Sequence, residues 1–320
     1  MTNRSLGRIL VIKLGALGDV VQALGPLAAI RRHHTAAEIT LLTSARFAGL
    51  LGSSPYVDRV WVDPRAPWWR LDALLALRRK LNAGDFARIY DLQTSARSTR
   101  YFRLLARPRP QWSGIAAGCS HPDSDPRRDR LHTLERQAGQ LRAAGIASVP
   151  PPDLSWVAAD ATRFALPARY AVLVPGGAAH RPDKRWPAEQ FSALACALAA
   201  RGTAPVLLGA AAERKLTGAI AAAAPGSIDL AGQTGLDDLV ALGRGAALAV
   251  GNDTGPMHLL AVAGAPALVL FSAASDPALC APRGPQVAIL RVPALADLAV
   301  ETVLRQLPAR SNPAPTLGLV

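Results

Sequence analysis

Four segments of the 320-residue chain place glycines and charged side chains directly after apolar runs. In one of them, VGNDTGPMHLLAVAG at residues 250–264, an apolar run ends on Asp253, Thr254 and Gly255, and a helix is predicted to begin one residue later. Backbone N–H groups at a helix start are unpaired and attract phosphate. We therefore expect Thr254 and Gly255, together with His258, to face a phosphate and Asp253 to bind sugar hydroxyls. Considered alone, His258 would be interpreted as a half-buried structural histidine.

A second segment, VPGGAAHRPDKRWP at residues 174–187, combines two glycines with two cations. Gly176 and Gly177 leave backbone N–H groups available to an anion, and Lys184 and Arg185 can neutralise a diphosphate. A solvated cationic loop is the alternative interpretation.

The third segment, LLGAAAERKL, places Glu213 shortly after a strand that is predicted to end in glycine. A carboxylate there can accept hydrogen bonds from ribose hydroxyls, as acidic residues do in nucleotide sites. From the sequence alone, a glutamate in the first turn of a helix, stabilised by the helix dipole, is favoured over that role.

The fourth segment is KLGALGDVV at residues 13–21. Gly15 and Gly18 allow an open turn between a strand and a helix, and Asp19 lies at or beside the helix N-cap. A plain capping aspartate and a functional carboxylate both remain open. The dinucleotide fingerprint fails, because Lys13 stands where its first glycine should be, which disfavours a nicotinamide oxidoreductase.

The rest of the sequence predicts an α/β protein built from parallel strands. Short, nearly continuous apolar runs are typical of strands covered on both faces, and here they alternate with helical patterns. The expected strands are 8–13, 39–43, 59–63, 88–92, 170–177, 204–209, 246–253, 265–271 and 286–292, and the expected helices are 20–32, 71–81, 131–144, 188–201 and 213–224.

The alternation stops once, at the proline-rich stretch 145–157, which we interpret as an interdomain linker. This predicts an N-terminal Rossmann-like domain over 1–150 and a C-terminal one over 151–310, whose last helix can pack back on the first domain. A flexible tail is expected over 311–320. Ligands of such sheets bind at the carboxyl ends of the strands.

The chain carries a net charge of +13. Residues 97–142 hold ten arginines against four acidic residues, a local net of +6. Only Tyr101, Phe102 and Trp112 are aromatic in this stretch, and it contains no helical reader motif, so we expect no nucleic-acid partner. An anionic phospholipid surface or a phosphorylated lipid fits the charge. A compositional bias spread over solvated faces is the alternative.

Cysteine usage and hydropathy argue against a disulfide-rich, metal-binding, secreted or membrane-spanning protein. The three cysteines, which are far apart, support neither a disulfide framework nor a Cys-x-x-Cys metal site. Cys119 with His121 and His132 lacks a fourth zinc ligand, so we expect no metal. Asp19 interrupts the apolar N-terminal run, which argues against a signal peptide. The uncharged stretch 254–275 is predicted to be a short helix and a short strand.

The residues resemble those of a known family. The stretches ILVIKLGALGDVVQALGPLAAIRR, KRWP and NDTGPMHLLAVAGAPALVLF are similar to motifs of the glycosyltransferase family 9 heptosyltransferases of the ADP-heptose:lipopolysaccharide type. The resemblance extends from about Arg8 to Val292. It implies a GT-B fold, in which two Rossmann-like doubly wound domains face a central cleft, with the acceptor on the N-terminal domain and the nucleotide sugar on the C-terminal one.

The resemblance also implies an inverting glycosyl transfer that needs neither metal nor cofactor, at the cytoplasmic face of the inner membrane. Asp19 matches the family's proposed general base. The residues that match donor-binding positions are Lys184, Glu213, Asp253, Thr254, Gly255 and His258. We expect Gly176 and Gly177 to bind the donor as well, because of their place in the glycine loop. For the phosphorylated glycolipid acceptor and the anionic leaflet, we expect Arg97, Arg100, Arg127 and Arg128 to provide contacts.

Gln22 and Gly25 depart from the family pattern, and the segment 97–136 matches none of its motifs. The donor sugar and the acceptor therefore stay open. A nucleotide-sugar-binding protein without transferase activity and a nucleotide-sugar epimerase of the same architecture remain alternatives.

Overall fold

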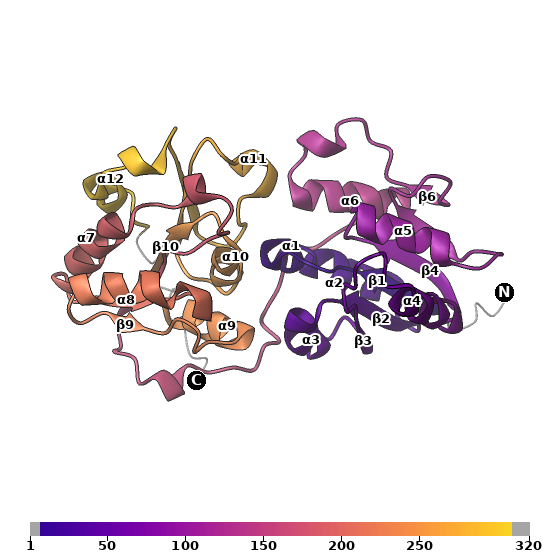
Figure 1. Ribbon diagram of the computed structural model, residues 1–320, viewed down its shortest axis with the longest axis horizontal. Helices are drawn as coiled ribbons and strands as arrows, with labels where there is room; N and C mark the ends of the chain where they lie inside the picture. Colours follow the sequence, from indigo (N-terminus) through magenta and orange to yellow (C-terminus); the bar gives the residue numbers. More distant parts are fainter. Residues whose placement is uncertain (1–6, 309–320) are drawn as a thin grey trace, which may run out of the picture. The chain divides into compact units, whose positions relative to one another are not determined.

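The computed structural model describes residues 7–308, and the chain divides after Val157 into two compact units. The first unit contains residues 7–157 and Ala278–Cys280, and the second contains the other described residues. Each unit is a parallel sheet with helices packed on it, so the predicted α/β class with two doubly wound domains is confirmed (Figure 1). The expected tail over 311–320 lies outside the described residues.

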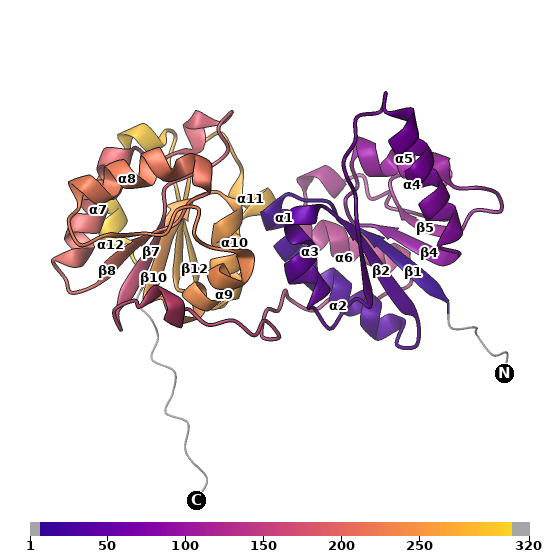
Figure 2. The ribbon, with the colours of Figure 1, turned by 60° about the horizontal axis from the view of Figure 1, so that its bottom comes forward.

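The sheet of the first unit has six parallel strands in the order β3-β2-β1-β4-β5-β6 (Figure 2). The strands are β1 (Arg8–Ile12), β2 (Glu38–Thr43), β3 (Arg59–Val62), β4 (Phe86–Asp91), β5 (Gln111–Gly114) and β6 (His121–Pro122). β1 lies between β2 and β4, and Ile9–Ile12 are buried. Coverage on both faces explains why this strand is apolar at consecutive positions rather than at alternating ones.

The helices of the first unit are α1 (Leu17–Gln22), α2 (Leu24–His33), α3 (Ala45–Gly52), α4 (Leu71–Ala83), α5 (Ala96–Leu104) and α6 (Thr133–Ala143). The single helix expected over 20–32 is therefore two helices, divided at Ala23. A Cβ atom on Gly25 would lie 2.1 Å from the carbonyl oxygen of Pro150, so only glycine fits where the proline-rich stretch crosses α2.

The second sheet repeats this arrangement in the order β12-β11-β10-β7-β8-β9. Its strands are β7 (Tyr170–Val174), β8 (Ala204–Leu207), β9 (Ile228–Asp229), β10 (Leu248–Asn252), β11 (Ala267–Phe271) and β12 (Val287–Arg291). The helices are α7 (Ala188–Ala199), α8 (Arg214–Ala223), α9 (Leu236–Gly245), α10 (Gly255–Val262), α11 (Pro277–Cys280) and α12 (Val300–Arg305). Val303 of α12 is fully buried in the core of this second unit.

The two sheets have the same topology. In each, the first strand in sequence lies beside the fourth, so connections leave in opposite directions from β1 and β4, and likewise from β7 and β10. Such a switch point opens a crevice at the carboxyl ends of the strands. The uncharged stretch 254–275 forms α10 and β11, as expected. No helix within residues 7–308 has the length and apolarity needed to cross a bilayer.

Candidate functional site

At the switch point of the second sheet, the side chain of Asn252 ties three segments together. Asn252 is the last residue of β10 and is fully buried. Its Oδ1 accepts a hydrogen bond from the backbone N–H of Trp186 at 3.0 Å, and its Nδ2 donates to the carbonyl oxygens of Pro175 at 2.8 Å and Gly176 at 3.2 Å. The glycine loop after β7 and the basic segment before α7 are therefore both fixed to the end of β10.

The next residue, Asp253, is paired with Lys184. Lys184 Nζ donates to Asp253 Oδ2 at 2.5 Å, and Ser275 Oγ donates to the same oxygen at 2.8 Å. Both charged side chains are largely shielded from solvent, with 13% and 8% exposure. Two predicted donor-binding residues separated by 69 positions in sequence are thus in direct contact. A shielded ammonium is suited to binding a diphosphate, because an ion pair strengthens as water is removed.

Glu213 has the structural role that the sequence favoured, in the first turn of a short 3-10 helix, and it also contacts the glycine loop. Its Oε1 accepts from Gly177 N at 2.9 Å, and its Oε2 accepts from Ala210 N at 2.7 Å. A Cβ atom on Gly176 would lie 2.0 Å from Glu213 Oε1, so this close approach requires glycine. Glu213 therefore holds the glycine loop in place, and the N–H of Gly177 is already bonded to a carboxylate.

A pocket of about 590 Å³ opens beside this loop. Its charged lining residues are Arg185, Glu213 and Lys215, and Gly177 contributes backbone. The volume lies within the usual range for small-ligand sites, about 300–1,000 Å³. Two cations and one carboxylate beside a glycine loop fit a nucleotide, whose diphosphate is anionic and whose ribose carries hydroxyl groups.

The helix that follows Asp253 begins as the sequence suggested. Thr254 is the N-cap residue of α10, with an extended backbone and no side-chain capping bond, and Gly255 is the first helical residue. The N-terminal end of α10 therefore directly follows Asp253 in sequence. The first N–H groups of a helix have no partner within the helix, so they are available to a ligand there. His258 lies one turn further along, and its side chain is buried, with 6% exposure.

In the first unit, Asp19 lies in the first turn of α1, three residues after the N-cap Ala16. Its Oδ2 accepts from the backbone N–H of Ala16 at 3.2 Å, which is the capping role that the sequence allowed. Asp19 is half-buried, and its Oδ1 has no hydrogen-bond partner among residues 7–308. One oxygen thus stabilises the helix start while the other is available to a ligand.

Two residues that sequence reasoning did not select support the turn before Asp19. Gln93, just after β4, accepts with its Oε1 from Leu14 N at 2.8 Å and from Gly15 N at 3.2 Å. Lys13 is buried and donates its Nζ to the carbonyl oxygen of Leu92 at 3.2 Å. Burial lowers the pKa of Lys13, and the nearby Asp19 carboxylate opposes that shift.

Asp91, the last residue of β4, completes this cluster. It is fully buried, and its Oδ1 accepts from Gln93 N at 3.1 Å and Thr94 N at 3.0 Å. Its Oδ2 lacks a hydrogen-bond partner in the described part of the chain. Burial raises the pKa of Asp91 to about 6. The sequence carried a sign of this residue, because the polar stretch DLQTS at 91–95 directly follows the apolar residues of a predicted strand. The four selected segments show the same pattern.

The four arginines expected at the acceptor or the membrane make contacts within the first unit. Arg97 donates to the carbonyl oxygens of two loop residues, and Arg100 lies over the ring of Trp68. Arg127 pairs with Asp125 on the surface. Arg128 pairs with Asp123 and donates to Thr94 Oγ1 at 2.7 Å. Of the four, Arg128 is thus bonded to the loop that follows Asp91.

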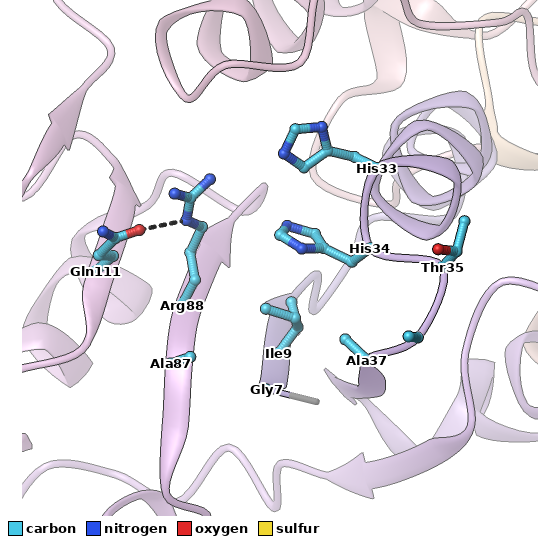
Figure 3. A pocket seen from close by; sticks show the side chains of 10 residues that line it. Gly7, Ile9, His33, His34, Thr35, Ala37, Ala87, Arg88 and Gln111 are labelled. Atoms are coloured by element: carbon cyan, nitrogen blue, oxygen red, sulfur yellow. Dashed lines mark hydrogen bonds between the residues drawn. The ribbon is translucent and has the colours of Figure 1, made fainter. Parts of the chain in front are cut away.

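A second cavity, of about 510 Å³, lies at the opposite edge of the first sheet, where the strands begin (Figure 3). Arg88 and His34 point into it, but their polar atoms are largely engaged with neighbouring groups. Arg88 donates to Gln111 Oε1, Tyr90 Oη and the carbonyl oxygen of Ala144, and His34 bonds to the same Tyr90 hydroxyl.

The described residues contain no group of three or more His, Cys, Asp or Glu side chains arranged to hold a metal ion. Cys119, Cys196 and Cys280 are free thiols.

Comparisons with known proteins agree with this arrangement. The sequence model of the family described as glycosyltransferase family 9 (heptosyltransferase) matches residues 74–303, which is more than half of the chain. The chain is 24% identical over 284 residues to a lipopolysaccharide core heptosyltransferase, OpsX, of Haemophilus influenzae. That alignment covers 82% of this chain and 78% of the relative.

Solved structures share the fold. A glycosyl transferase family 9 protein from Veillonella parvula superposes with a TM-score of 0.80 at 20% identity, covering 93% of this chain and 95% of that one. The E. coli heptosyltransferase WaaC, solved with ADP, superposes with a TM-score of 0.74 at 23% identity, covering 93% and 98%. The predicted GT-B class is therefore confirmed at the level of the fold.

Proposed function

The chain belongs to glycosyltransferase family 9 (heptosyltransferase), and from that premise we propose that it transfers a sugar from a nucleotide-sugar donor to a glycolipid acceptor. We infer that the donor is ADP-heptose and the acceptor a phosphorylated lipopolysaccharide core or a related glycolipid. The relative OpsX is named for lipopolysaccharide core heptosyl transfer, and WaaC was solved with ADP. On this proposal the enzyme works at the cytoplasmic face of the inner membrane.

The observation that carries the proposal is the shielded Lys184–Asp253 pair, because Arg185, the residue next to Lys184, lines the 590 Å³ pocket. When a donor binds, its diphosphate forms an ion pair with Lys184 in place of Asp253. The Asp253 carboxylate, which keeps its hydrogen bond from Ser275, then accepts hydrogen bonds from the sugar hydroxyls. The N–H groups at the start of α10 add further donors to the phosphate oxygens. The nucleoside occupies the pocket lined by Arg185 and Lys215.

In the transfer step, we propose that Asp19 acts as the general base. Its carboxylate takes the proton of the acceptor hydroxyl while the hydroxyl oxygen attacks the anomeric carbon of the donor. The bond from that carbon to the diphosphate oxygen breaks on the opposite side, which inverts the configuration. Lys184 and the α10 N–H groups stabilise the negative charge that develops on the departing nucleoside diphosphate. These groups supply what a metal ion supplies elsewhere, so no metal or cofactor is required.

The test is a panel of nucleotide sugars followed by thermal unfolding, because a ligand that binds only the folded protein raises its melting temperature. We expect ADP-heptose to give the largest rise and to support transfer to a lipopolysaccharide core acceptor, with or without a chelator. A panel in which no nucleotide sugar raises the melting temperature contradicts the proposal. Conversion of the donor in the absence of acceptor would instead indicate an epimerase, and binding without any turnover would indicate a binding protein.

A further inference from the structure

Helix α4 of the first unit has leucines on two faces, and packing explains only one of them. On the inner face, Leu81 is buried in the core of the first unit and Leu77 packs against it. On the outer face, Leu71 is 67% exposed and Leu75 is 48% exposed. Trp69, just before the helix, is 81% exposed. Three of the large exposed hydrophobic side chains of the described chain therefore lie within seven consecutive residues.

The outer leucines continue into exposed arginines. Residues three or four apart lie on the same side of a helix, so Leu71 and Leu75 are neighbours, and Arg78 and Arg79 extend the same stripe. Both arginines are exposed. We call Trp69, Leu71, Leu75, Arg78 and Arg79 the α4 surface. Figure 2 labels the helix α4 that carries most of it. Single exposed hydrophobic residues are ordinary on proteins, but an apolar group continuous with a basic one is not.

The charge around this surface is one-sided. Residues 65–80 contain five basic residues and one acidic residue, a local net of +4, and the acidic one, Asp72, is held by Arg70. The basic residues are Arg65, Arg70, Arg78, Arg79 and Lys80. Arg65, Arg78 and Arg79 have no carboxylate within salt-bridge distance among the described residues. The partner of this surface should therefore be both apolar and anionic.

The loop that presents Trp69 is held in place from behind. Arg97 of α5 donates to the carbonyl oxygens of Arg65 at 3.0 Å and Ala66 at 2.8 Å. The guanidinium carbons of Arg97 and Arg100 lie 5.2 Å and 4.9 Å from the ring centroid of Trp68. Two arginines that the sequence suggested for lipid contact thus fix the base of the loop, and the adjacent Trp69 is directed outward.

From this combination we propose that the α4 surface docks the enzyme on an anionic lipid bilayer. Tryptophan favours the headgroup region, outward leucines enter the boundary of the acyl chains, and arginines bind lipid phosphates. The inference rests on the proposed function for its biological setting, since a glycolipid acceptor is held in a membrane. It assigns that contact to α4 rather than to the arginines of 97–142.

The experiment is co-sedimentation of the full chain with vesicles, without nucleotide sugar or acceptor. One set is phosphatidylcholine alone, and the other is phosphatidylcholine mixed with phosphatidylglycerol. We expect binding to the mixed vesicles only. Arg79→Gln should weaken binding to them about fivefold, because each basic residue near an anionic surface contributes about 1 kcal/mol. Trp69→Ser combined with Leu75→Ser should weaken it about tenfold or more, because apolar area is no longer buried.

Matched controls separate this surface from general charge and hydrophobicity. Arg201→Gln removes an exposed cation of the second unit, and Ile289→Ser removes an exposed apolar side chain there. Both should bind vesicles as the unmodified protein does. Trp69→Leu should keep the binding but lose most of the quenching of tryptophan fluorescence by lipids brominated on their acyl chains.

Equal binding of the Trp69→Ser, Leu75→Ser variant and the unmodified protein would overturn the inference. So would binding that does not depend on phosphatidylglycerol. If light scattering shows that the same variant converts a dimer into a monomer, the surface belongs to a second copy of the chain. Because no sugar transfer is measured, vesicle binding can succeed or fail independently of the proposed enzymatic activity.

Discussion

The two switch points of this protein have the same topology but end their fourth strands differently. β4 ends on Asp91 and β10 ends on Asn252, and both side chains are fully buried. Asn252 satisfies three backbone groups of neighbouring segments, because an amide both donates and accepts. Asp91 accepts two N–H bonds and leaves one oxygen unpaired. The two side chains differ only in an amide nitrogen or a carboxyl oxygen at one position. That difference makes Asn252 a fully hydrogen-bonded structural residue and Asp91 an acid with a raised pKa.

The charged side chains around the two switch points also differ between the units. In the second unit, the one ion pair at the switch point, Lys184 with Asp253, is already formed and is available for exchange with a charged ligand. In the first unit, the carboxylates of Asp19 and Asp91 both lie close enough to Lys13 to oppose the lowering of its pKa by burial. This arrangement suits a donor diphosphate in one unit and proton transfer in the other.

The largest effect is expected from the first unit, with Asp19→Asn. Asparagine keeps an oxygen for the N–H of Ala16 but cannot accept the acceptor's proton. We expect kcat for transfer to fall by about two to four orders of magnitude, the range typical of general-base loss, with little change in the donor dissociation constant. Steady-state kinetics and donor titration measure the two quantities separately. Weakened donor binding, or full activity, would show that Asp19 is not the base.

The second prediction exchanges the amide for an acid in the second unit, with Asn252→Asp. A carboxylate can still accept from Trp186 but places a negative charge against the carbonyl oxygens of Pro175 and Gly176. Buried charges without partners are costly, so the free energy of unfolding should fall by about 2–4 kcal/mol and donor binding should weaken with it. Denaturant unfolding with and without donor measures both. Stability equal to that of the unmodified protein would mean that these bonds are not needed.

The reciprocal substitution, Asp91→Asn, should be tolerated and should change the pH dependence. The folded pKa of Asp91 is about 6 against an ordinary value of 3.8, so the folded protein keeps this proton when the unfolded chain has lost it. The contribution of Asp91 to stability is thus largest below pH 4 and is lost as pH rises through 6, by up to about 3 kcal/mol at 1.36 kcal/mol per pKa unit.

Asparagine cannot ionise and removes this decline. The stability of Asp91→Asn relative to the unmodified protein should therefore rise between pH 4 and pH 7, as measured by denaturant unfolding across that range. Parallel curves for the two proteins would show that Asp91 is not an acid with a raised pKa. Asp297→Asn, which changes an exposed aspartate of the second unit, provides the matched control.

Most of the architecture could be predicted, because buried parallel strands leave consecutive apolar residues in the sequence. Helices α3 and α9 were missed as well, but several of the other missed elements leave a weaker signal. α5 (Ala96–Leu104) is rich in Ser, Thr and Arg, and β6 has only two residues. β5 contains a single large apolar residue, Trp112. The break at Ala23 between α1 and α2 was also missed.

The candidate site was predictable where its residues sit in glycine-rich turns after strands. Asp253 and Lys184 were found in this way, although the contact between them over 69 residues was not. Side chains that accept hydrogen bonds from distant backbone N–H groups could not be predicted, because the local sequence of a glutamine or glutamate does not indicate which N–H group it will bind. Glu213 and Gln93 are the two examples, one in each unit.

The smallest effect is expected from Gln93→Leu, which tests whether the first switch point needs the same kind of brace that Glu213 gives the second. Leucine leaves the N–H groups of Leu14 and Gly15 without their acceptor, so the turn that carries Asp19 should become less ordered. We expect kcat to fall about tenfold while KM for the donor stays the same, because the donor-binding residues belong to the other unit. Gln93→Glu keeps the accepting oxygen and should restore most of kcat. If leucine and glutamate lower kcat equally, or if KM rises with Gln93→Leu, the side chain does not position Asp19.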